Sequence, residues 1–332
     1  MQLLSGSVEI LDLRHFAAPA LRPVLEGEGE LWEQRLHWDY HASARLLMQY
    51  LDNHMLPGFA ALESGRVMGY VFCVYEENKA VIGDVFALPG AANAASGELG
   101  PACCIEETLL RHLFELLLNS PHVDRIESQL LLHSAGKFAE IFRATGFEIF
   151  RRLYLVQPLQ GRSSSARPDL PPNLELRPWR EADLAPAARL ICDAYRGHPD
   201  GLINDQYRSA HGSMRFLNNI VHYAGCGTFA PAASFVVVER DSRELAALVL
   251  GSRVSTLSGH LTQVCVHPAF RRRGLARMLL AQAASSFIRL GASEISLTVT
   301  EANPEAIRLY YDEGYTCTHS FDAAVWQRQA TA

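Results

Sequence analysis

The pattern of apolar and polar positions predicts the same succession of elements twice along this chain of 332 residues. Apolar residues at every second position indicate strands, and apolar residues three and four apart indicate amphipathic helices. Each half is predicted to start with a strand and two helices, to continue with a hairpin and another strand, and to close with helix, strand, helix and strand. In the first half these elements are expected at 8–13, 17–32, 41–55, 59–63, 67–75, 80–88, 102–119, 125–132, 135–145 and 147–157. In the second half they are expected at 174–177, 184–195, 206–223, 235–239, 245–254, 261–266, a helix ending at 290, 294–300, 304–313 and 316–325.

A stretch rich in glycine, serine and proline separates the two halves at residues 160–173. This composition is typical of a linker. We therefore expect two domains, at 1–159 and 174–328, of the α/β (α+β) class, each with helices flanking a mixed, mostly antiparallel sheet. The repeated order favours an internal duplication.

Composition and charge limit the classes of function. The hydrophobic content of 48% and charged content of 20% are those of folded domains. A net charge of -6 argues against a general attraction to nucleic acid or to an anionic membrane. The N-terminal residues lack the pattern of a signal peptide, and no apolar run is long enough to span a bilayer. The seven scattered cysteines favour reduced thiols over a disulfide frame or a zinc site, so we expect a cytoplasmic protein without a metal.

The strongest chemical signal lies between Thr262 and Leu280. An apolar strand end is followed by His267-Pro268, three arginines, Gly274 and an amphipathic segment. This order predicts a strand, a loop and a helix. The free N–H groups and the dipole at a helix start favour an anion such as a pyrophosphate. The alternative is that the arginines are a solvated basic turn.

Two motifs in this half resemble those of the GNAT N-acetyltransferase superfamily. The first is Arg271-x-x-Gly274-x-Ala276 after Val266-His267-Pro268, and the second runs from Asn303 to Tyr315. The resemblance covers roughly 174–325 and implies a splayed sheet that binds acetyl-CoA. The first half resembles the family only in its order of elements.

The resemblance implies a set of residues that bind acetyl-CoA. The amides of the arginine loop would donate to the pyrophosphate, and the backbone of Cys265 and Val266 would contact the pantetheine arm and the thioester. The Cys265 side chain is expected to be a small core residue and not a nucleophile. The expected cofactor-binding residues are Val264, Cys265, Val266, Arg271, Arg272, Arg273, Gly274, Leu275, Ala276, Arg277 and Asn303.

Tyr310 is the expected catalytic residue. By resemblance, its phenol would protonate the thiolate that leaves when an amine attacks acetyl-CoA. Tyr311 must point elsewhere, because adjacent helical residues diverge. The alternative for Tyr310 is a packed aromatic side chain. The general base is open: Thr262 stands where many relatives have a glutamate.

Other candidates for the base and for the acceptor site are less specific. His260, His267 and Glu301 lie near the motifs in sequence, but each is equally compatible with a turn or surface position. In the polar connection between the first two helices, Asp200, Asn204 and Tyr207 are candidates to bind the acceptor. The alternative is that these residues only cap the following helix.

The first half is predicted to be a degenerate copy. Aligning Gly146-Phe147 with Gly314-Tyr315 matches Phe142 with Tyr310, and a phenylalanine cannot donate a proton. Aligning Pro89 with Pro268 places residues 90–97, which include no basic residue, at the arginine loop. We expect this half to pack against the active domain and to shape the acceptor site.

The sequence therefore predicts an acetyl-CoA-dependent N-acetyltransferase that acts on a primary amine, with a small-molecule acceptor favoured. The alternative is a non-catalytic acetyl-CoA-binding regulator or interaction protein, which would need the loop but not Tyr310. A nucleic-acid-binding function is disfavoured, because no wider basic patch surrounds the arginines. Oligomeric state and acyl-chain length stay open.

Overall fold

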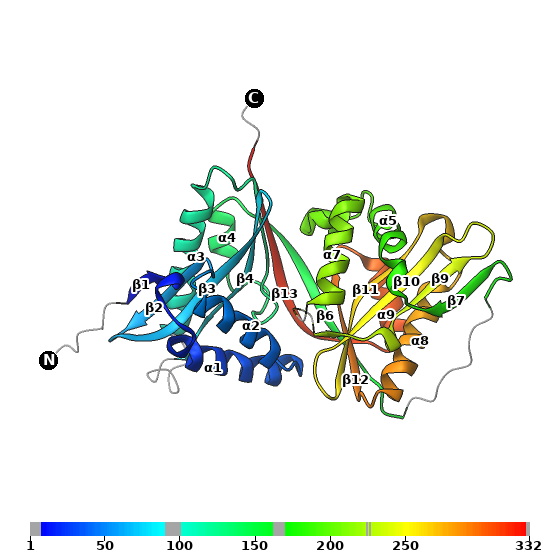
Figure 1. Ribbon diagram of the computed structural model, residues 1–332, viewed down its shortest axis with the longest axis horizontal. Coiled ribbons are helices and arrows are strands. Elements are labelled where there is room, and N and C mark those ends of the chain that lie inside the picture. Colours follow the sequence, from blue (N-terminus) through cyan, green and yellow to red (C-terminus); the bar gives the residue numbers. More distant parts are fainter. Residues whose placement is uncertain (1–7, 90–100, 162–169, 224, 226, 330–332) are drawn as a thin grey trace. The chain divides into compact units, whose positions relative to one another are not determined.

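A computed structural model describes residues 8–89, 101–161, 170–223, 225 and 227–329. The chain folds as two compact units, which Figure 1 shows in the colours of the sequence. Unit 1 comprises Met1–Leu36, Tyr40–Phe150 and Phe321–Ala332, and unit 2 comprises His37–Asp39 and Arg151–Ser320. Among the described residues, no helix is long and apolar enough to cross a membrane.

Unit 1 is a mixed sheet with helices on both faces. Its strands follow the order β1-β2-β3-β4-β5-β13, antiparallel except for the parallel pair β4 and β5. The strands are β1 (Glu9–Asp12), β2 (Gly58–Glu63), β3 (Arg66–Glu76), β4 (Lys79–Ala87), β5 (Arg125–Gln129) and the end of β13 (Thr316–Gln327). The helices are α1 (Ala18–Leu36), α2 (His41–Asp52), α3 (Pro101–Leu118) and α4 (Ala139–Ala144), with a 3-10 turn at Leu13–His15.

Alternation along β3 assigns the two faces of this sheet. Tyr70 packs with the side chains of α1 and α2, including Leu21 and Leu51. Val71, the next residue, packs with α3 and α4 through Leu113 and other apolar residues. Successive strand residues point to opposite faces, so the period of two in the sequence builds both cores.

Unit 2 has the same plan. Its sheet follows the order β6-β12-β11-β10-β9-β7, parallel only between β11 and β12, with β8 beside β10. The strands are β6 (Glu148–Pro158), β7 (Leu174–Pro178), β8 (Thr228–Phe229), β9 (Phe235–Glu239), β10 (Leu245–Arg253), β11 (Ser258–Val266) and β12 (Glu294–Thr300). The helices are α5 (Leu184–Ala194), α6 (Asp200–Ile203), α7 (Ala210–His222), α8 (Leu275–Arg289) and α9 (Pro304–Asp312). The 3-10 turns are Glu181–Asp183, Asp205–Arg208, Pro231–Ala233 and Pro268–Phe270.

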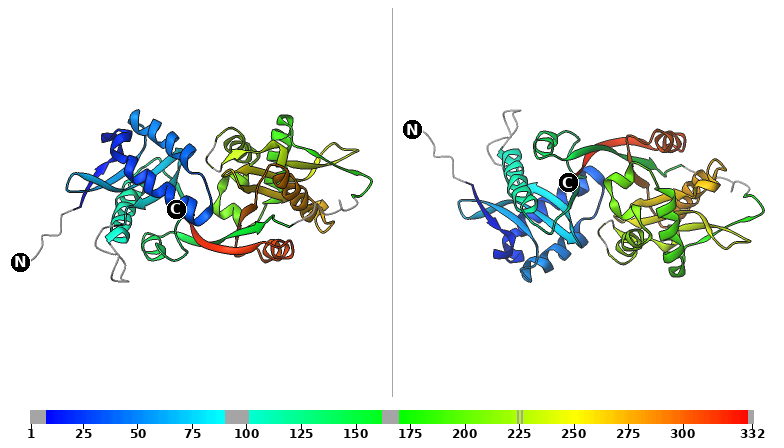
Figure 2. Two further views of the ribbon diagram at one scale, coloured as in Figure 1. Left: turned by 90° about the horizontal axis from the view of Figure 1, so that it is seen from below. Right: turned by 90° about the horizontal axis from the view of Figure 1, so that it is seen from above.

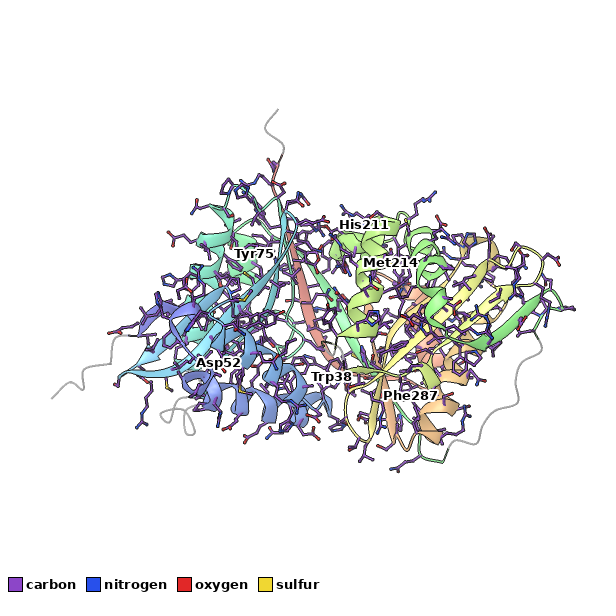
Figure 3. All side chains as sticks on the ribbon, viewed as in Figure 1. Trp38, Asp52, Tyr75, His211, Met214 and Phe287 are labelled. Atoms are coloured by element: carbon purple, nitrogen blue, oxygen red, sulfur yellow. The ribbon has the colours of Figure 1, made fainter. Side chains whose placement is uncertain are left out.

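Helices also cover both faces of this second sheet, as the two turned views show (Figure 2). Helices α5 and α7 pack on one face against Val236, Leu248 and Cys265. Helix α8 packs on the other face, where Phe287 is completely buried among β10, β11 and β12 (Figure 3). The α+β class with mixed, mostly antiparallel sheets, predicted from the sequence, is thereby confirmed.

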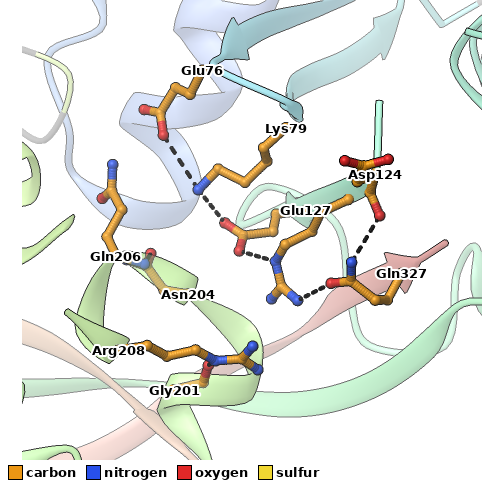
Figure 4. Close-up of polar contacts among 10 residues, drawn as sticks. Glu76, Lys79, Asp124, Glu127, Gly201, Asn204, Gln206, Arg208 and Gln327 are labelled. Atoms are coloured by element: carbon orange, nitrogen blue, oxygen red, sulfur yellow. Dashed lines mark hydrogen bonds and ion pairs between the residues drawn. The ribbon is translucent and has the colours of Figure 1, made fainter. Parts of the chain in front are cut away.

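The two units exchange their closing strands, so they differ from the contiguous ranges 1–159 and 174–328 expected from sequence. Residues 151–158 of β6 pair with β12 in unit 2, and residues 323–327 of β13 pair with β5 in unit 1. Gln327 anchors the end of β13 there: it accepts from Arg125 Nη1 at 3.2 Å and donates to Asp124 O at 2.9 Å (Figure 4). Alternation predicts which face of a strand is apolar, but not which sheet the strand joins.

A short segment between α1 and α2 also belongs to unit 2. Trp38 donates its indole N–H to Tyr154 Oη at 2.8 Å and lies edge-on to the ring of His260. Asp39 N donates to Val254 O at 2.7 Å. These contacts hold residues 37–39 on strands of the second sheet.

Most predicted elements are confirmed, and 206–223 is the main difference. This segment is a 3-10 turn followed by α7, with Ser209 between them in an extended conformation. The Ser209 hydroxyl accepts from Gly212 N at 2.9 Å and so starts a new helix. Of the predicted linker, residues 162–169 lie outside the described residues.

Candidate acyl-CoA site

Strand β11 leaves its parallel neighbour β12 after four residue pairs. The register runs from Ser258–Glu294 to Leu261–Leu297, whereas the pairing of β11 with β10 continues to Val266. Thr262 is an extra residue at the point where the register with β10 shifts. Beyond Leu261, the β12 side of β11 is therefore unpaired with β12, which is the splay that the resemblance implies.

The backbone groups of Val264 and Val266 point to this open side. His267 donates its N–H to Ala246 O of β10 at 2.9 Å. Because alternate residues in a strand direct their backbone groups to opposite sides, those of Val266 and Val264 face away from β10. Alternation thus favours Val264 and Val266 for the backbone contacts that were expected of Cys265 and Val266.

The arginine loop ends in a helix start that no side chain caps. Arg272 and Gly274 both have left-handed backbones, with φ of 63° and 78°. The first helical bond joins Met278 N to Gly274 O, so the amides of residues 275–277 have no acceptor in the helix. A Cβ at Gly274 would meet no atom within 4 Å, so its φ is what favours glycine here. These amides and the helix dipole suit an anion.

Two of the four arginines tie the loop to neighbouring helices. Arg271 donates from Nη2 to Ala194 O at the end of α5, at 2.8 Å. Arg277, on the first turn of α8, forms an ion pair of 2.8 Å with Glu313 just after α9. Leu275 between them is buried in the core, so only its amide is suited to a ligand. Arg271 and Arg277 therefore position the loop as well as adding positive charge.

All four arginines are exposed, and Arg272 and Arg273 lie at the centre of the loop. The Arg273 guanidinium lies 5.1 Å from the Phe270 ring centroid and donates to Ala269 O at 3.2 Å. Ala276, which follows the loop, is half-buried, so a small side chain borders the free amides. All members of the predicted loop thus lie around one helix start.

Tyr310 lies inside unit 2, with 8% of its surface exposed, whereas Tyr311 is 47% exposed. The prediction that Tyr311 points away from the direction of Tyr310 is confirmed. Burial raises the pKa of Tyr310 above that of a phenol in water, Asp200 and Cys265 raise it further, and Arg152 opposes the rise. The phenol therefore keeps its proton at neutral pH.

Two tyrosines of unit 2, Tyr195 and Tyr207, share Gln263, a residue that is not among those predicted from the sequence. Gln263 Nε2 donates to Tyr195 Oη at 3.0 Å, and Tyr207 Oη donates to Gln263 Oε1 at 3.4 Å. The rings of Tyr195 and Tyr207 stack with centroids 4.4 Å apart. Burial raises the pKa of both phenols. Gln263 shares a strand face with Cys265, two residues away, which is the signal that could have found it.

The connection after α5 brings Asp200 to the same region. Thr300 Oγ1 donates to Asp200 Oδ1 at 2.5 Å, and Asp200 N donates to His198 Nδ1 at 3.1 Å. Asn303 caps α9 by accepting from Ala306 N at 3.2 Å, and its amide lies 3.1 Å from His198 Nε2. In this structure Asn303 thus has a capping role and links α9 to the connection.

Other polar groups of the connection bond within it. Asn204 accepts from Gln206 N at 3.0 Å, and Arg208 Nε donates to Gly201 O at 2.6 Å (Figure 4). The alternative considered for Asn204, local capping, accounts for this contact. Of the three candidate acceptor residues, Asp200 lies within electrostatic reach of Tyr310, Tyr207 stacks on Tyr195, and Asn204 supports the turn.

None of the three base candidates is placed beside Tyr310 by a direct contact among the described residues. His260 lies 2.9 Å from Ser296 Oγ, and burial lowers its pKa to about 3, so it stays neutral. His267 accepts from Ala269 N in the loop, and Glu301 is exposed in the turn after β12. Thr262 donates to Leu250 O at 3.2 Å.

In unit 1, a histidine side chain bonds to the strand that corresponds to the open part of β11. In the alignment of Pro89 with Pro268, Val85 matches Val264. His133 Nε2 donates to Val85 O at 2.7 Å, and burial lowers the pKa of His133 to about 4. Phe142, the counterpart of Tyr310, is buried in an apolar cluster. Residues 90–97, expected to replace the arginine loop, lie outside the described residues.

Comparisons with known proteins agree with this geometry. Residues 201–315 match the model of the Acetyltransferase (GNAT) family. The chain is similar to a GCN5-related N-acetyltransferase from Sphaerobacter thermophilus, with a TM-score of 0.62, 16% identity, and coverage of 100% of this chain and 98% of the other.

Two further solved structures have a similar fold. One is a tandem GNAT protein from the clavulanic acid biosynthesis pathway, with a TM-score of 0.61, 14% identity, and coverage of 98% and 100%. The other is a GCN5-related glucosamine N-acetyltransferase region of a fungal multi-domain GH3 β-N-acetylglucosaminidase, with a TM-score of 0.60, 14% identity, and coverage of 98% and 38%. Residues 201–315, which include the splayed part of the second sheet and the uncapped start of α8, thus match the GNAT family model, and the whole chain has a fold similar to that of solved tandem GNAT proteins.

Proposed function

We propose that unit 2 transfers an acetyl group from acetyl-CoA to a primary amine of a small molecule. The observation that carries this proposal is the burial of the Tyr310 phenol within electrostatic reach of Cys265, which lies in the part of β11 that is unpaired with β12. The uncapped start of α8 in the same unit would hold the pyrophosphate. Charge-assisted hydrogen bonds contribute about 1.5–3 kcal/mol each, so several amides and arginines would bind CoA without a metal.

In the proposed reaction, the amine nitrogen attacks the thioester carbonyl carbon and the carbon–sulfur bond breaks. Tyr310 would donate its proton to the departing thiolate, and the attacking nitrogen would lose one proton to solvent or to a base. The Tyr310 phenol suits this role because its raised pKa keeps it protonated until a thiolate forms beside it. The N–H groups of Val264 and Val266 would orient the pantetheine arm and the thioester.

The test is the rate at which free thiol is released from acetyl-CoA in the presence of a panel of amines. Tyr310→Phe should lower kcat by about 100-fold, at the lower end of the effect of general acid catalysis, and should leave the Kd for CoA nearly unchanged. Tyr311→Phe is the matched control, because Tyr311 is the exposed neighbour on the same helix. Unchanged turnover in Tyr310→Phe would exclude the phenol as the acid.

The same assay separates the enzyme from a non-catalytic acetyl-CoA-binding regulator. Thr262 stands where a glutamate base was expected and bonds to Leu250 O, which favours the regulator on this one point. A regulator would bind CoA and release no thiol with any amine. A single amine that raises thiol release above the rate of hydrolysis would identify the enzyme.

A further inference from the structure

The face of the second sheet that carries Gln263 and Cys265 is polar at its β12 and β6 strands. Along β12, Ile295, Leu297 and Val299 pack into the apolar core with α8. The alternating residues Ser296, Thr298 and Thr300 therefore lie on the opposite face. Ser296 and Thr300 are each at most 2% exposed. Burying hydroxyl groups costs free energy unless they are bonded, and each of the three has a partner: Gly259 O for Ser296, Arg152 for Thr298 and Asp200 for Thr300.

Arg152 lies on the same polar face and comes from β6. Its neighbours Leu153 and Leu155 pack with the α8 core, Leu153 directly beside it in sequence. Arg152 is paired in register with Thr300, and its Nη2 donates to Thr298 Oγ1 at 3.2 Å. The guanidinium is thus hydrogen-bonded to Thr298 and lies beside Thr300 in the register of the two strands.

Asp200 reaches Thr300 of β12 from a different element. It begins α6 and accepts from Thr300 Oγ1 at 2.5 Å. Both charges act on the phenol of Tyr310. Burial is the largest cause of its raised pKa, Asp200 raises the pKa further, and Arg152 lowers it. A negative and a positive side chain therefore lie around Thr300 and within electrostatic reach of the proposed acid.

We propose that Arg152 binds an anionic group of the acceptor, a carboxylate or a phosphate, while Asp200 binds its ammonium group. The acceptor class is then a small molecule that carries both an amine and an anion. This inference rests on the proposed function. A guanidinium binds either anion through two parallel hydrogen bonds, which a lysine cannot reproduce. Only the free amine attacks, so Asp200 would hold the ammonium form before its proton is lost.

The experiment compares matched acceptors with and without the anion. The pairs are β-alanine and 3-aminopropanamide for the carboxylate, and phosphoethanolamine and ethanolamine for the phosphate. Glucosamine 6-phosphate and glucosamine extend the second comparison to an aminosugar. The readouts are kcat/KM from thiol release and the Kd of each compound for the CoA-loaded protein by calorimetry.

In the natural protein, the anionic member of at least one pair should have the higher kcat/KM and bind more tightly. Arg152→Gln should reduce kcat/KM for that member by about 10- to 100-fold, because a hydrogen bond to a charged group contributes about 1.5–3 kcal/mol. The neutral member should change little, and Arg152→Lys should retain part of the preference. Arg151→Gln is the matched control, since Arg151 is the exposed neighbour on the same strand.

The two proposals fail in different ways. Equal use and equal binding of both members of every pair, in the natural protein and in Arg152→Gln, would overturn the role of Arg152 whether or not thiol is released. Binding of an anionic member that depends on Arg152, without thiol release from any amine, would keep this inference and overturn the acetyltransferase. If Arg152→Gln unfolds, the Arg152→Lys variant decides. Lysine keeps the positive charge but cannot form the two parallel hydrogen bonds, so this change alone should weaken the preference for the anion.

Discussion

At the scale of single residues, burial shifts the pKa values of titratable groups in both units. In unit 2 it keeps the Tyr310 phenol protonated and His260 neutral. In unit 1 it raises the pKa of Asp84 to about 7 on the β4 face that meets α1. Asp84 accepts from Val85 N at 2.8 Å, and His133 Nε2 lies 3.6 Å away. Glu28 from α1, also completely buried, accepts from Tyr70 Oη at 2.5 Å.

The free energy of unfolding of the Asp84→Asn variant, relative to that of the natural protein, should increase as the pH rises. Folded Asp84 holds its proton more tightly than the unfolded carboxyl, whose pKa is 3.8. The stability that Asp84 contributes is therefore complete below about pH 4 and is lost as the pH rises to about 7. Asparagine does not titrate and can still accept from Val85 N.

The measurement is the free energy of unfolding of both proteins in urea, at several pH values between about 4 and about 8. The difference between variant and natural protein should grow in favour of the variant up to about pH 7 and then level off. His133, with a lowered pKa of about 4, titrates in both proteins, so its effect largely cancels. A difference that does not change with pH would contradict the raised pKa of Asp84.

At the scale of elements, the site depends on how closely α8 packs on β11. Phe287 of α8 lies over two glycines of the sheet, Gly251 and Gly259. A Cβ built on Gly259 would lie 2.5 Å from a ring atom of Phe287. The absence of a side chain at these positions lets α8 approach the sheet, and this approach places the helix start beside the end of β11.

Gly259→Ala should lower the free energy of unfolding by about 1–3 kcal/mol, as overpacking of a core does. Phe287 is completely buried, so its ring cannot swing into solvent to make room. Combining Gly259→Ala with Phe287→Leu should cost less than the sum of the two single changes, because the smaller side chain leaves space for the methyl group. Urea unfolding of the four proteins measures this, and strictly additive losses would show that the ring is not the obstacle.

At the scale of the whole molecule, each unit depends on a strand from the other half of the sequence. Residues 323–327 of β13 pair with β5, and Ala324 is buried in the core of unit 1. Arg328 donates from Nη2 to Ser120 O and Val123 O, both at 2.8 Å. Residues 151–158 of β6 complete unit 2 in the same way, and they include Arg152.

A chain that ends at Ser320 should therefore lose structure in unit 1, although the deletion lies at the end of the second half. Without β13, β5 becomes an unpaired edge strand, and apolar side chains around Ala324 become exposed. Hydrogen–deuterium exchange should show faster uptake in β4, β5 and α3, with little change in α8 and β12. A chain that ends at Gln329 is the control. Faster uptake confined to unit 2 would contradict the exchange of strands.

Local chemistry explains which parts of the site the sequence could predict. The arginine loop, the start of α8 and the opposite directions of Tyr310 and Tyr311 depend on residues close together in the chain. Period and turn residues determine such features. Alternation along the strand could also have predicted the position of Gln263, because Gln263 shares a strand face with Cys265. The assignment of Asn303 to the cofactor came from resemblance, and in the structure Asn303 caps α9 and contacts His198.

The sequence by itself determined the duplicated order of elements, the two apolar faces of each sheet and the loop-to-helix start at Gly274. Only the tertiary structure decided which strand completes which sheet, and hence that Arg152 joins the residues around Tyr310. Alternation along a strand specifies the face on which each side chain lies, but any sheet edge can accept a strand with the same pattern. The choice of neighbour depends on contacts between residues far apart in the chain, such as those of Thr300 with Asp200 and with its register partner Arg152.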